Sequence, residues 1–216
     1  MKITVGGSFH EPGWTAVCET VKRLKEAGHE VLAPGEEWEP INNTDDYVRF
    51  KGEENASAFE LQEGFLSCID QSDAYVICNP NSYEGFMVSF EFGYASACII
   101  QGKGPMKYIC FTETPLGFDK YSLDEKMSLE EFKQRLYTEP SYSKELAYFH
   151  KIREKDDGYF GYGDESDYYE DLLSMYGKLK LLEARGALII GIDNLIELDK
   201  NTSQSSREQA EEEIEF

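Results

Sequence analysis

The chain has 216 residues, 41% of them hydrophobic, so it is long enough to bury the core of one large domain. Its 42 acidic and 21 basic residues give a formal net charge of −21. This charge excludes a nucleic-acid polymer as a partner, because binding a polyanion requires a basic surface. A small phosphorylated ligand stays compatible with it, since backbone N–H groups at a helix start hold a phosphate without net positive charge.

The composition also indicates the compartment. The five cysteines form no C-x-x-C pair and the three histidines show no ligand spacing, so we expect reduced core thiols, no metal site and no cofactor. A strand-like run, Lys2 to Val5, opens the sequence, and no signal peptide is expected. The longest apolar runs, such as Ala187 to Ile192, are far shorter than the about 20 residues that cross a bilayer. The prediction is a cytoplasmic protein with no membrane partner.

The first 35 residues predict a βαβ unit. Lys2 to Val5 is rich in β-branched residues, and Gly6-Gly7-Ser8 breaks the run. An amphipathic pattern from about Trp14 to Ala27 predicts a helix, and Gly28 is the residue expected to end it. Residues 30–33 are again extended, so the helix is the crossover between two parallel strands.

Strands and helices alternate along the next part of the chain. Residues 35–55 are polar and lack periodicity, which predicts a long loop over the sheet edge. Apolar spacing then predicts a helix over 56–69, a buried strand over 73–78, a helix over 88–100 and a strand over 107–112.

The C-terminal part is less regular. The patterns predict helices from Ser128, over 143–154 and over 168–185, a glycine- and tyrosine-rich loop over 156–167, and a last strand over 187–192. We expect one domain over residues 1–200, in which 115–185 form a helical insertion or extension. Residues 201–216 are predicted to be a disordered acidic tail.

This alternation predicts an α/β fold with a doubly wound, mostly parallel sheet of about five strands, similar to flavodoxin and Rossmann folds. Ligands of such sheets bind outside the carboxyl ends of the strands, at the point where the strand order reverses. Three segments converge there: Gly6 to Pro12, Asn79 to Val88, and the stretch after Thr112.

Glu91 is the candidate catalytic residue. We place it in the first turn of the helix that follows the buried strand, where the helix dipole and free N–H groups favour the ionised carboxylate. A carboxylate there can attack an anomeric carbon or stabilise an oxocarbenium ion. The alternative is an ordinary acidic residue of a first turn, where acids are common without any catalytic role.

Three motifs resemble the nucleoside 2-deoxyribosyltransferase-like superfamily, which includes deoxynucleoside-monophosphate N-glycosidases. They are Gly7-Ser8 after the first strand, Ser72-Asp73-Ala74-Tyr75-Val76 in the third, and Gly85 followed by Glu91-Phe92-Gly93-Tyr94-Ala95. The resemblance covers about residues 1–115. It implies a nucleoside or nucleotide as the small-molecule substrate, Glu91 as the nucleophile at C1′, and Gly6, Gly7 and Ser8 as lining of the nucleotide pocket. It is also consistent with a homo-oligomer, because related enzymes often complete the pocket with a neighbouring subunit.

One position departs from the family pattern. The classical enzymes have an aspartate eight residues before the aspartate of the third strand, where it helps to protonate the leaving base, and this chain has Phe65 there. Glu63 lies on the wrong side of the predicted helix, so His10, Glu11 and Glu84 are the alternatives for this acid. The departure keeps two functions open: cleavage or exchange of an N-glycosidic bond, and nucleotide binding or sensing without catalysis.

The substrate-binding candidates are the residues of the converging loops: Gly6, Gly7, Ser8, Phe9, His10, Asn79, Asn81, Glu84 and Gly85. Ser8 is equally explained as a helix cap, and the two asparagines as ordinary turn residues. A third hypothesis is a scaffold in which the acidic tail and the long C-terminal half, residues 116–216, contact a protein partner.

Overall fold

The computed structural model describes residues 1–9, 13–34, 40–41, 48–80, 86–114 and 178–201. The chain divides into two compact units, one made of Met1–Gly117 and Leu182–Phe216 and the other of Phe118–Leu181. The second unit corresponds almost entirely to residues outside the described part, so the fold below is that of the first unit. No helix among the described residues is long and apolar enough to cross a membrane.

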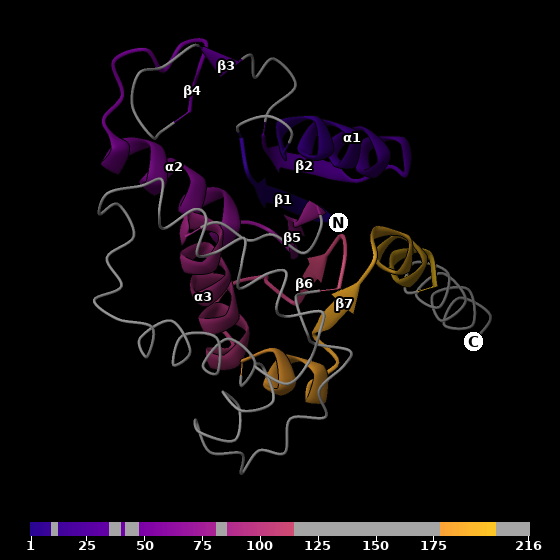
Figure 1. Ribbon diagram of the computed structural model, residues 1–216. Helices are drawn as coiled ribbons and strands as arrows, with labels where there is room; N and C mark the ends of the chain where they lie inside the picture. Colours follow the sequence, from indigo (N-terminus) through magenta and orange to yellow (C-terminus); the bar gives the residue numbers. More distant parts are fainter. Residues whose placement is uncertain (10–12, 35–39, 42–47, 81–85, 115–177, 202–216) are drawn as a thin grey trace, which may run out of the picture. The chain divides into compact units, whose positions relative to one another are not determined.

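A five-stranded parallel sheet forms the centre of this unit (Figure 1). Its strands run in the order β2-β1-β5-β6-β7, and every neighbouring pair is parallel. Their bounds are Lys2–Gly7 for β1, Glu30–Ala33 for β2, Ala74–Cys78 for β5, Tyr108–Phe111 for β6 and Leu188–Ile190 for β7. The strand order reverses between β1 and β5, as in flavodoxin-like sheets, and the predicted α/β fold is confirmed.

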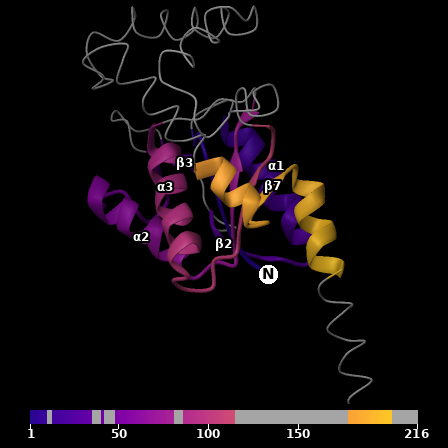
Figure 2. The same ribbon diagram turned by 90° about the horizontal axis from the view of Figure 1, so that it is seen from below.

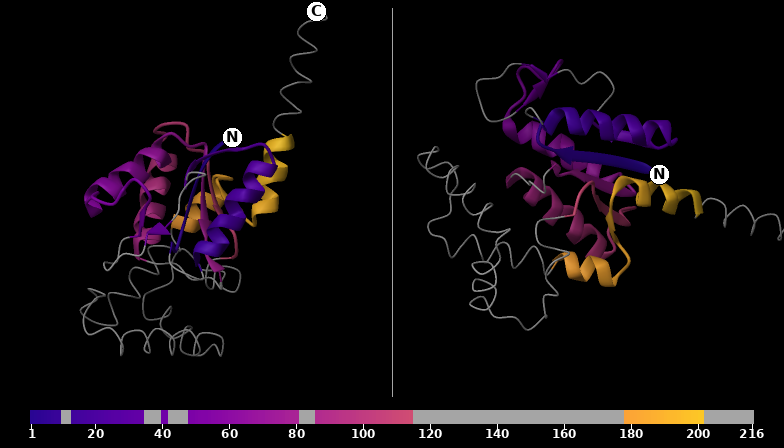
Figure 3. Two further views of the ribbon diagram at one scale, coloured as in Figure 1. Left: turned by 90° about the horizontal axis from the view of Figure 1, so that it is seen from above. Right: turned by 45° about the vertical axis from the view of Figure 1, so that its right-hand side comes forward.

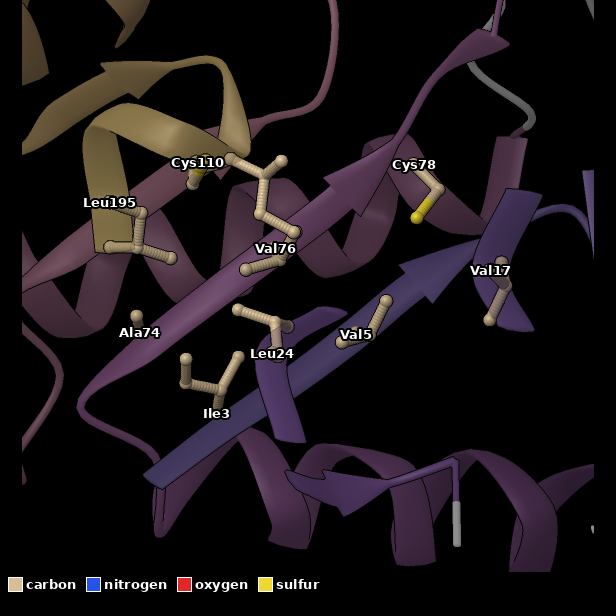
Figure 4. Packing of buried hydrophobic residues seen from close by; sticks show 10 residues of the cluster. Ile3, Val5, Val17, Leu24, Ala74, Val76, Cys78, Cys110 and Leu195 are labelled. Atoms are coloured by element: carbon tan, nitrogen blue, oxygen red, sulfur yellow. The ribbon is translucent and has the colours of Figure 1, made fainter. Parts of the chain in front are cut away.

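Helices cover both faces of the sheet. On one side lie α1, Gly13–Glu26, and the helical residues 192–201; on the other lie α2, Ala58–Asp70, and α3, Phe86–Gln101 (Figures 2 and 3). Alternation along the strands separates the two layers, because successive side chains point to opposite faces. Figure 4 shows the α1 side, where the following residues form one core cluster: Ile3, Val5, Val17, Leu24, Ala74, Val76, Cys78, Cys110, Ile192 and Leu195.

The start of α2 follows from its sequence. Ser57 precedes the helix with an extended backbone, and its hydroxyl accepts from the N–H of Glu60 at 3.3 Å. The Glu60 carboxylate returns the interaction by accepting from the N–H of Ser57 at 2.8 Å. This capping box satisfies N–H groups that the helix itself cannot pair, and a lost cap typically costs about 0.5–2 kcal/mol.

Two parts of the structure differ from the sequence prediction. Within the predicted long loop of residues 35–55, Pro40–Ile41 (β3) and Arg49–Phe50 (β4) form a short antiparallel pair. The predicted last strand ends early, because Gly191 turns with φ +85° and a helix of residues 192–201 follows. The predicted helices from Ser128 and over 143–154, the loop over 156–167 and the tail from 202 onward lie outside the described residues, as does most of the predicted helix over 168–185.

Candidate functional site

Glu91 is a buried acid on the inner side of α3. Only 7% of its surface is exposed, and among the residues that the structure describes it is the one buried carboxylic acid. The helix starts at Phe86, so Glu91 is its sixth residue and lies in the second turn. The expectation of a first-turn position was therefore wrong, because the helix begins two residues earlier than the apolar pattern indicated.

Among the residues that the structure describes, two side chains hold the Glu91 carboxyl group. The hydroxyl of Tyr75 on β5 donates to Oε2 at 2.6 Å, in a completely buried contact. Nε2 of Gln62 on α2 donates to Oε1 at 3.4 Å. The acid thus joins one strand and two helices that lie side by side on the same face of the sheet (Figures 1 and 2).

Burial raises the pKa of Glu91 to about 7, and the hydrogen bonds from Tyr75 and Gln62 lower it by less. The expected stabilisation of the ionised form by the helix start does not prevail, because the carboxylate loses its water shell and sits a turn away from the free N–H groups. Near neutral pH the carboxyl group is therefore divided between its two protonation states. Catalytic acids and bases are often tuned to this range.

Gly6 makes room for the tyrosine that holds the acid. Thr4 is the register partner of Tyr75 and Gly6 that of Ile77, so the face of β1 that carries Thr4 and Gly6 also receives the Tyr75 ring. A Cβ atom on Gly6 would lie 2.0 Å from the Tyr75 hydroxyl oxygen. The first glycine of the turn is thus explained by packing against Tyr75, and the predicted contact between this glycine and a substrate stays a prediction.

This arrangement lies at the reversal of strand order. Gly6 is near the carboxyl end of β1 and Tyr75 is in the adjacent β5, the two strands between which the order changes direction. In open α/β sheets the crevice at such a point is the usual place for a ligand. The buried acid is therefore next to the edge of the sheet where binding is expected.

The turn after β1 is closely packed. A Cβ on Gly7 would lie 2.9 Å from the Val17 side chain, and a Cβ on Gly13 would lie 2.6 Å from the Ser8 carbonyl oxygen. These contacts bring the end of β1 directly against the start of α1. Small residues are required here by close approach, whether or not the turn also binds a ligand.

Phe9 lies among aromatic rings that extend to the acid's partner. Its ring centroid is 5.7 Å from that of Trp14, 5.6 Å from Phe50 and 6.1 Å from Phe65. Phe65 in turn contacts Tyr75 at 6.4 Å. We name this group the aromatic cluster: Phe9, Trp14, Phe50, Phe65 and Tyr75. Phe9 and Trp14 are partly exposed.

Phe65 therefore packs at the position where the deoxyribosyltransferase-like enzymes, which this chain resembles, have the aspartate that helps to protonate the leaving base. Its exposure is 8%, and it fills the space between Phe9 and Tyr75. Glu63 is exposed on α2, as the helical spacing predicted. The side chain of α2 that contacts Glu91 is Gln62, about one turn before Phe65.

Asn79 connects the ends of two neighbouring strands. Its Nδ2 donates to the Glu113 carbonyl at 3.0 Å, and its Oδ1 accepts from the Glu113 N–H at 2.9 Å and from the Thr112 hydroxyl at 3.2 Å. The side chain is completely buried. These bonds give Asn79 a structural role in closing the carboxyl edge of β5 and β6, and its predicted contact with a substrate stays a prediction.

The remaining candidates of the loops, His10, Asn81, Glu84 and Gly85, lie outside the described residues, as does Glu11. Among the residues that are described, no group of three potential ligands could hold a metal ion.

Tyr94, of the Glu-Phe-Gly-Tyr-Ala element, interacts elsewhere. Its hydroxyl donates to Oδ1 of Asp70, the last residue of α2, at 2.7 Å. The hydrogen bond to the carboxylate and burial together raise the pKa of Tyr94 to about 12. These two side chains line an open hollow with Cys98, Gln101 and Lys103, toward the C-terminal ends of α2 and α3.

Sequence reasoning missed Tyr75 and Gln62 as members of the site. Tyr75 lies in a strand with an unbroken apolar pattern, and in such a strand an aromatic residue is normally interpreted as part of the hydrophobic core. The signal that could have found it is the glycine two positions beyond its register partner on β1, which leaves space for a large ring.

No family model matches the chain, and no curated protein matches it. A crystal structure of a conserved protein from Enterococcus faecalis V583 aligns with 86% of this chain and 97% of that chain, at 14% sequence identity and a TM-score of 0.39. A likeness of this degree says nothing about function, which has to be inferred from the side chains of the site.

Proposed function

We propose that the protein cleaves or exchanges the N-glycosidic bond of a nucleoside or its 5′-monophosphate, with Glu91 as the nucleophile. The observation that supports this most strongly is the buried Glu91 carboxyl, held by Tyr75 at 2.6 Å beside the reversal of strand order. A carboxyl kept in place by a neighbouring strand is pre-positioned for attack, and burial leaves it with little solvation to lose. The resemblance to the deoxyribosyltransferase-like superfamily adds support of a weaker kind.

The chemistry follows two displacements. A carboxylate oxygen of Glu91 forms an ester bond with C1′ while the C1′–N bond breaks and its electron pair leaves with the base. Water or a second base then attacks C1′, and the ester bond breaks to return the carboxylate. The base gains its proton from a group of the site or from solvent. The ionised form of Glu91 is the reactive one, so turnover increases as the pH rises through about 7.

A second candidate function is nucleotide binding without bond cleavage. It is favoured by Phe65, which packs between Phe9 and Tyr75 where the resembling enzymes have an acid. Positioned acids are typically worth about 10²–10⁴-fold in rate. A pocket without one binds its ligand but leaves the base in place.

We propose in addition that the protein is cytoplasmic and forms a homo-oligomer.

Free-base release distinguishes the two functions. The protein is incubated with a panel of nucleosides and 5′-monophosphates, with and without an acceptor base, and products are separated by liquid chromatography. Glu91→Gln, which keeps the shape of the side chain, should abolish release, whereas Glu63→Gln at an exposed position of α2 should not change it. Ligand binding without release would favour the second function, and release that survives in Glu91→Gln would remove Glu91 as the nucleophile.

A further inference from the structure

Gln62 contacts Glu91 but has no role so far in the proposed reaction. Its Nε2 contacts Oε1 of Glu91 at 3.4 Å, and its side chain is partly exposed. Tyr75, on the other carboxyl oxygen, is completely buried. The Glu91 carboxyl therefore has one oxygen on the core side and one oxygen beside a residue that reaches solvent.

The two oxygens are held with different strength. The contact of 2.6 Å from Tyr75 to Oε2 is a short hydrogen bond, whereas 3.4 Å from Gln62 to Oε1 exceeds the usual range of about 2.7–3.2 Å. An oxygen that bonds to C1′ has to loosen its existing contact, and this costs less at Oε1. Oε1 is therefore the oxygen that is better placed to react.

We propose that Gln62 recognises the substrate sugar at C2′, and that the substrates are ribonucleosides or ribonucleotides. This inference rests on the proposed function. Once Oε1 of Glu91 approaches C1′, the group beside that oxygen is also beside the neighbours of C1′, and C2′ is the neighbour that carries a hydroxyl in ribose. A primary amide has two N–H donors and a carbonyl acceptor, so the N–H that contacts Glu91 leaves the amide capacity for a hydroxyl as far as the described residues occupy it.

The same geometry disfavours a 2′-deoxy substrate. A methylene group at C2′ offers the amide of Gln62 no hydrogen bond in the complex, and a polar group that loses its partner on binding is costly. Sites that hydrogen-bond a hydroxyl discriminate strongly against the analogue that lacks it. Hydrogen bonds to this hydroxyl also strengthen as the sugar becomes an oxocarbenium ion, so the preference should appear in kcat/KM.

The test compares matched ribo and 2′-deoxy substrates that carry the same base. We expect the wild-type protein to favour the ribo substrate by at least about 10-fold in kcat/KM. Gln62→Leu should reduce this ratio to within about 3-fold, mainly by slowing the ribo substrate. Gln62→Met, which keeps the length of the side chain without the amide, should do the same. Gln101→Leu, the same change at an exposed glutamine at the end of α3, should keep the wild-type ratio.

The outcomes separate the role of Gln62 from the proposed function. A wild-type protein that favours the deoxy substrate, or a ratio that stays unchanged in both Gln62 variants, overturns the role of Gln62 and leaves a Glu91-dependent activity intact. An absence of base release from every substrate, or release that does not need Glu91, overturns the proposed function and this role with it.

Discussion

Replacing Tyr75 with phenylalanine removes the hydroxyl that donates to Glu91 at 2.6 Å, while the ring can keep its contact with Phe65. A hydrogen bond to a charged group contributes about 1.5–3 kcal/mol, and one pKa unit corresponds to about 1.4 kcal/mol. The bond stabilises the carboxylate more than the protonated acid, so its loss should raise the pKa of Glu91 above 7 by roughly one to two units.

The assay is the pH dependence of kcat/KM for base release, between pH 5 and pH 10. In the wild-type protein activity should rise through about pH 7, and in Tyr75→Phe the same rise should occur one to two units higher. At pH 7 this is a loss of roughly 5- to 50-fold, because half of the wild-type Glu91 is ionised there, and most of the loss returns at high pH. Tyr94→Phe is the matched control, because it removes a tyrosine–carboxylate bond of 2.7 Å on the same helix as Glu91.

A loss of activity in Tyr75→Phe that is equal at every pH would contradict an effect of the hydroxyl on the pKa of Glu91. That result would mean that the hydroxyl acts on the substrate or on the fold and does not tune the carboxyl group. A profile that shifts equally in Tyr94→Phe would refute it as well, since the effect would then not be specific to the site.

Three further predictions concern stability, and each is measured by urea unfolding. Folding raises the pKa of Glu91 from 4.5 to about 7, so the contribution of its protonation to the free energy of unfolding is fully present below pH 4.5 and is lost as the pH rises through 7. Between pH 4.5 and pH 9, Glu91→Gln should therefore gain roughly 3 kcal/mol in the free energy of unfolding relative to the wild-type protein. A difference between the two proteins that does not change with pH would contradict this. Gly6→Ala should destabilise the folded protein by about 1–3 kcal/mol, because the new Cβ would overlap the Tyr75 hydroxyl. Gly64→Ala is the control, since a Cβ there lies in open space on α2, and it should stabilise the protein by up to about 1 kcal/mol. Equal effects of the two substitutions would contradict the packing of Gly6 against Tyr75. Asn79→Ala should cost about 1–3 kcal/mol, since it removes three partly buried hydrogen bonds between the ends of β5 and β6, and an unchanged unfolding midpoint would show that these bonds are not needed.

Apart from the short pair of β3 and β4, the strands and helices that the structure describes within residues 1–114 were predictable because each has a clear apolar pattern. β5 is completely buried and reads as a short apolar run, and α1 shows its apolar stripe at Val17, Val21 and Leu24. The helix over 192–201 was missed although Ile192, Leu195 and Ile196 have helical spacing, because the preceding run of apolar residues was read as strand to its end.

The site was predictable only in part. Glu91 could be identified from its place after a buried strand, but its environment depends on Tyr75 and Gln62, which come from 16 and 29 residues away in the chain. The direction of its pKa was mispredicted, since the helix dipole is a local property whereas burial is set by three packed elements. Asn79 illustrates the same limit, because its hydrogen bonds go to Thr112 and Glu113, directly after β6 and more than 30 residues away.

The role of Glu91 as the nucleophile is tested most directly by the rate of free-base release by the wild-type protein and by Glu91→Gln, measured side by side at pH 8 on the best substrate of the panel. We expect release by the wild-type protein and a loss of at least about 10³-fold in the variant, as for the removal of a covalent nucleophile. Equal rates for the two proteins, or no release by either, would contradict it.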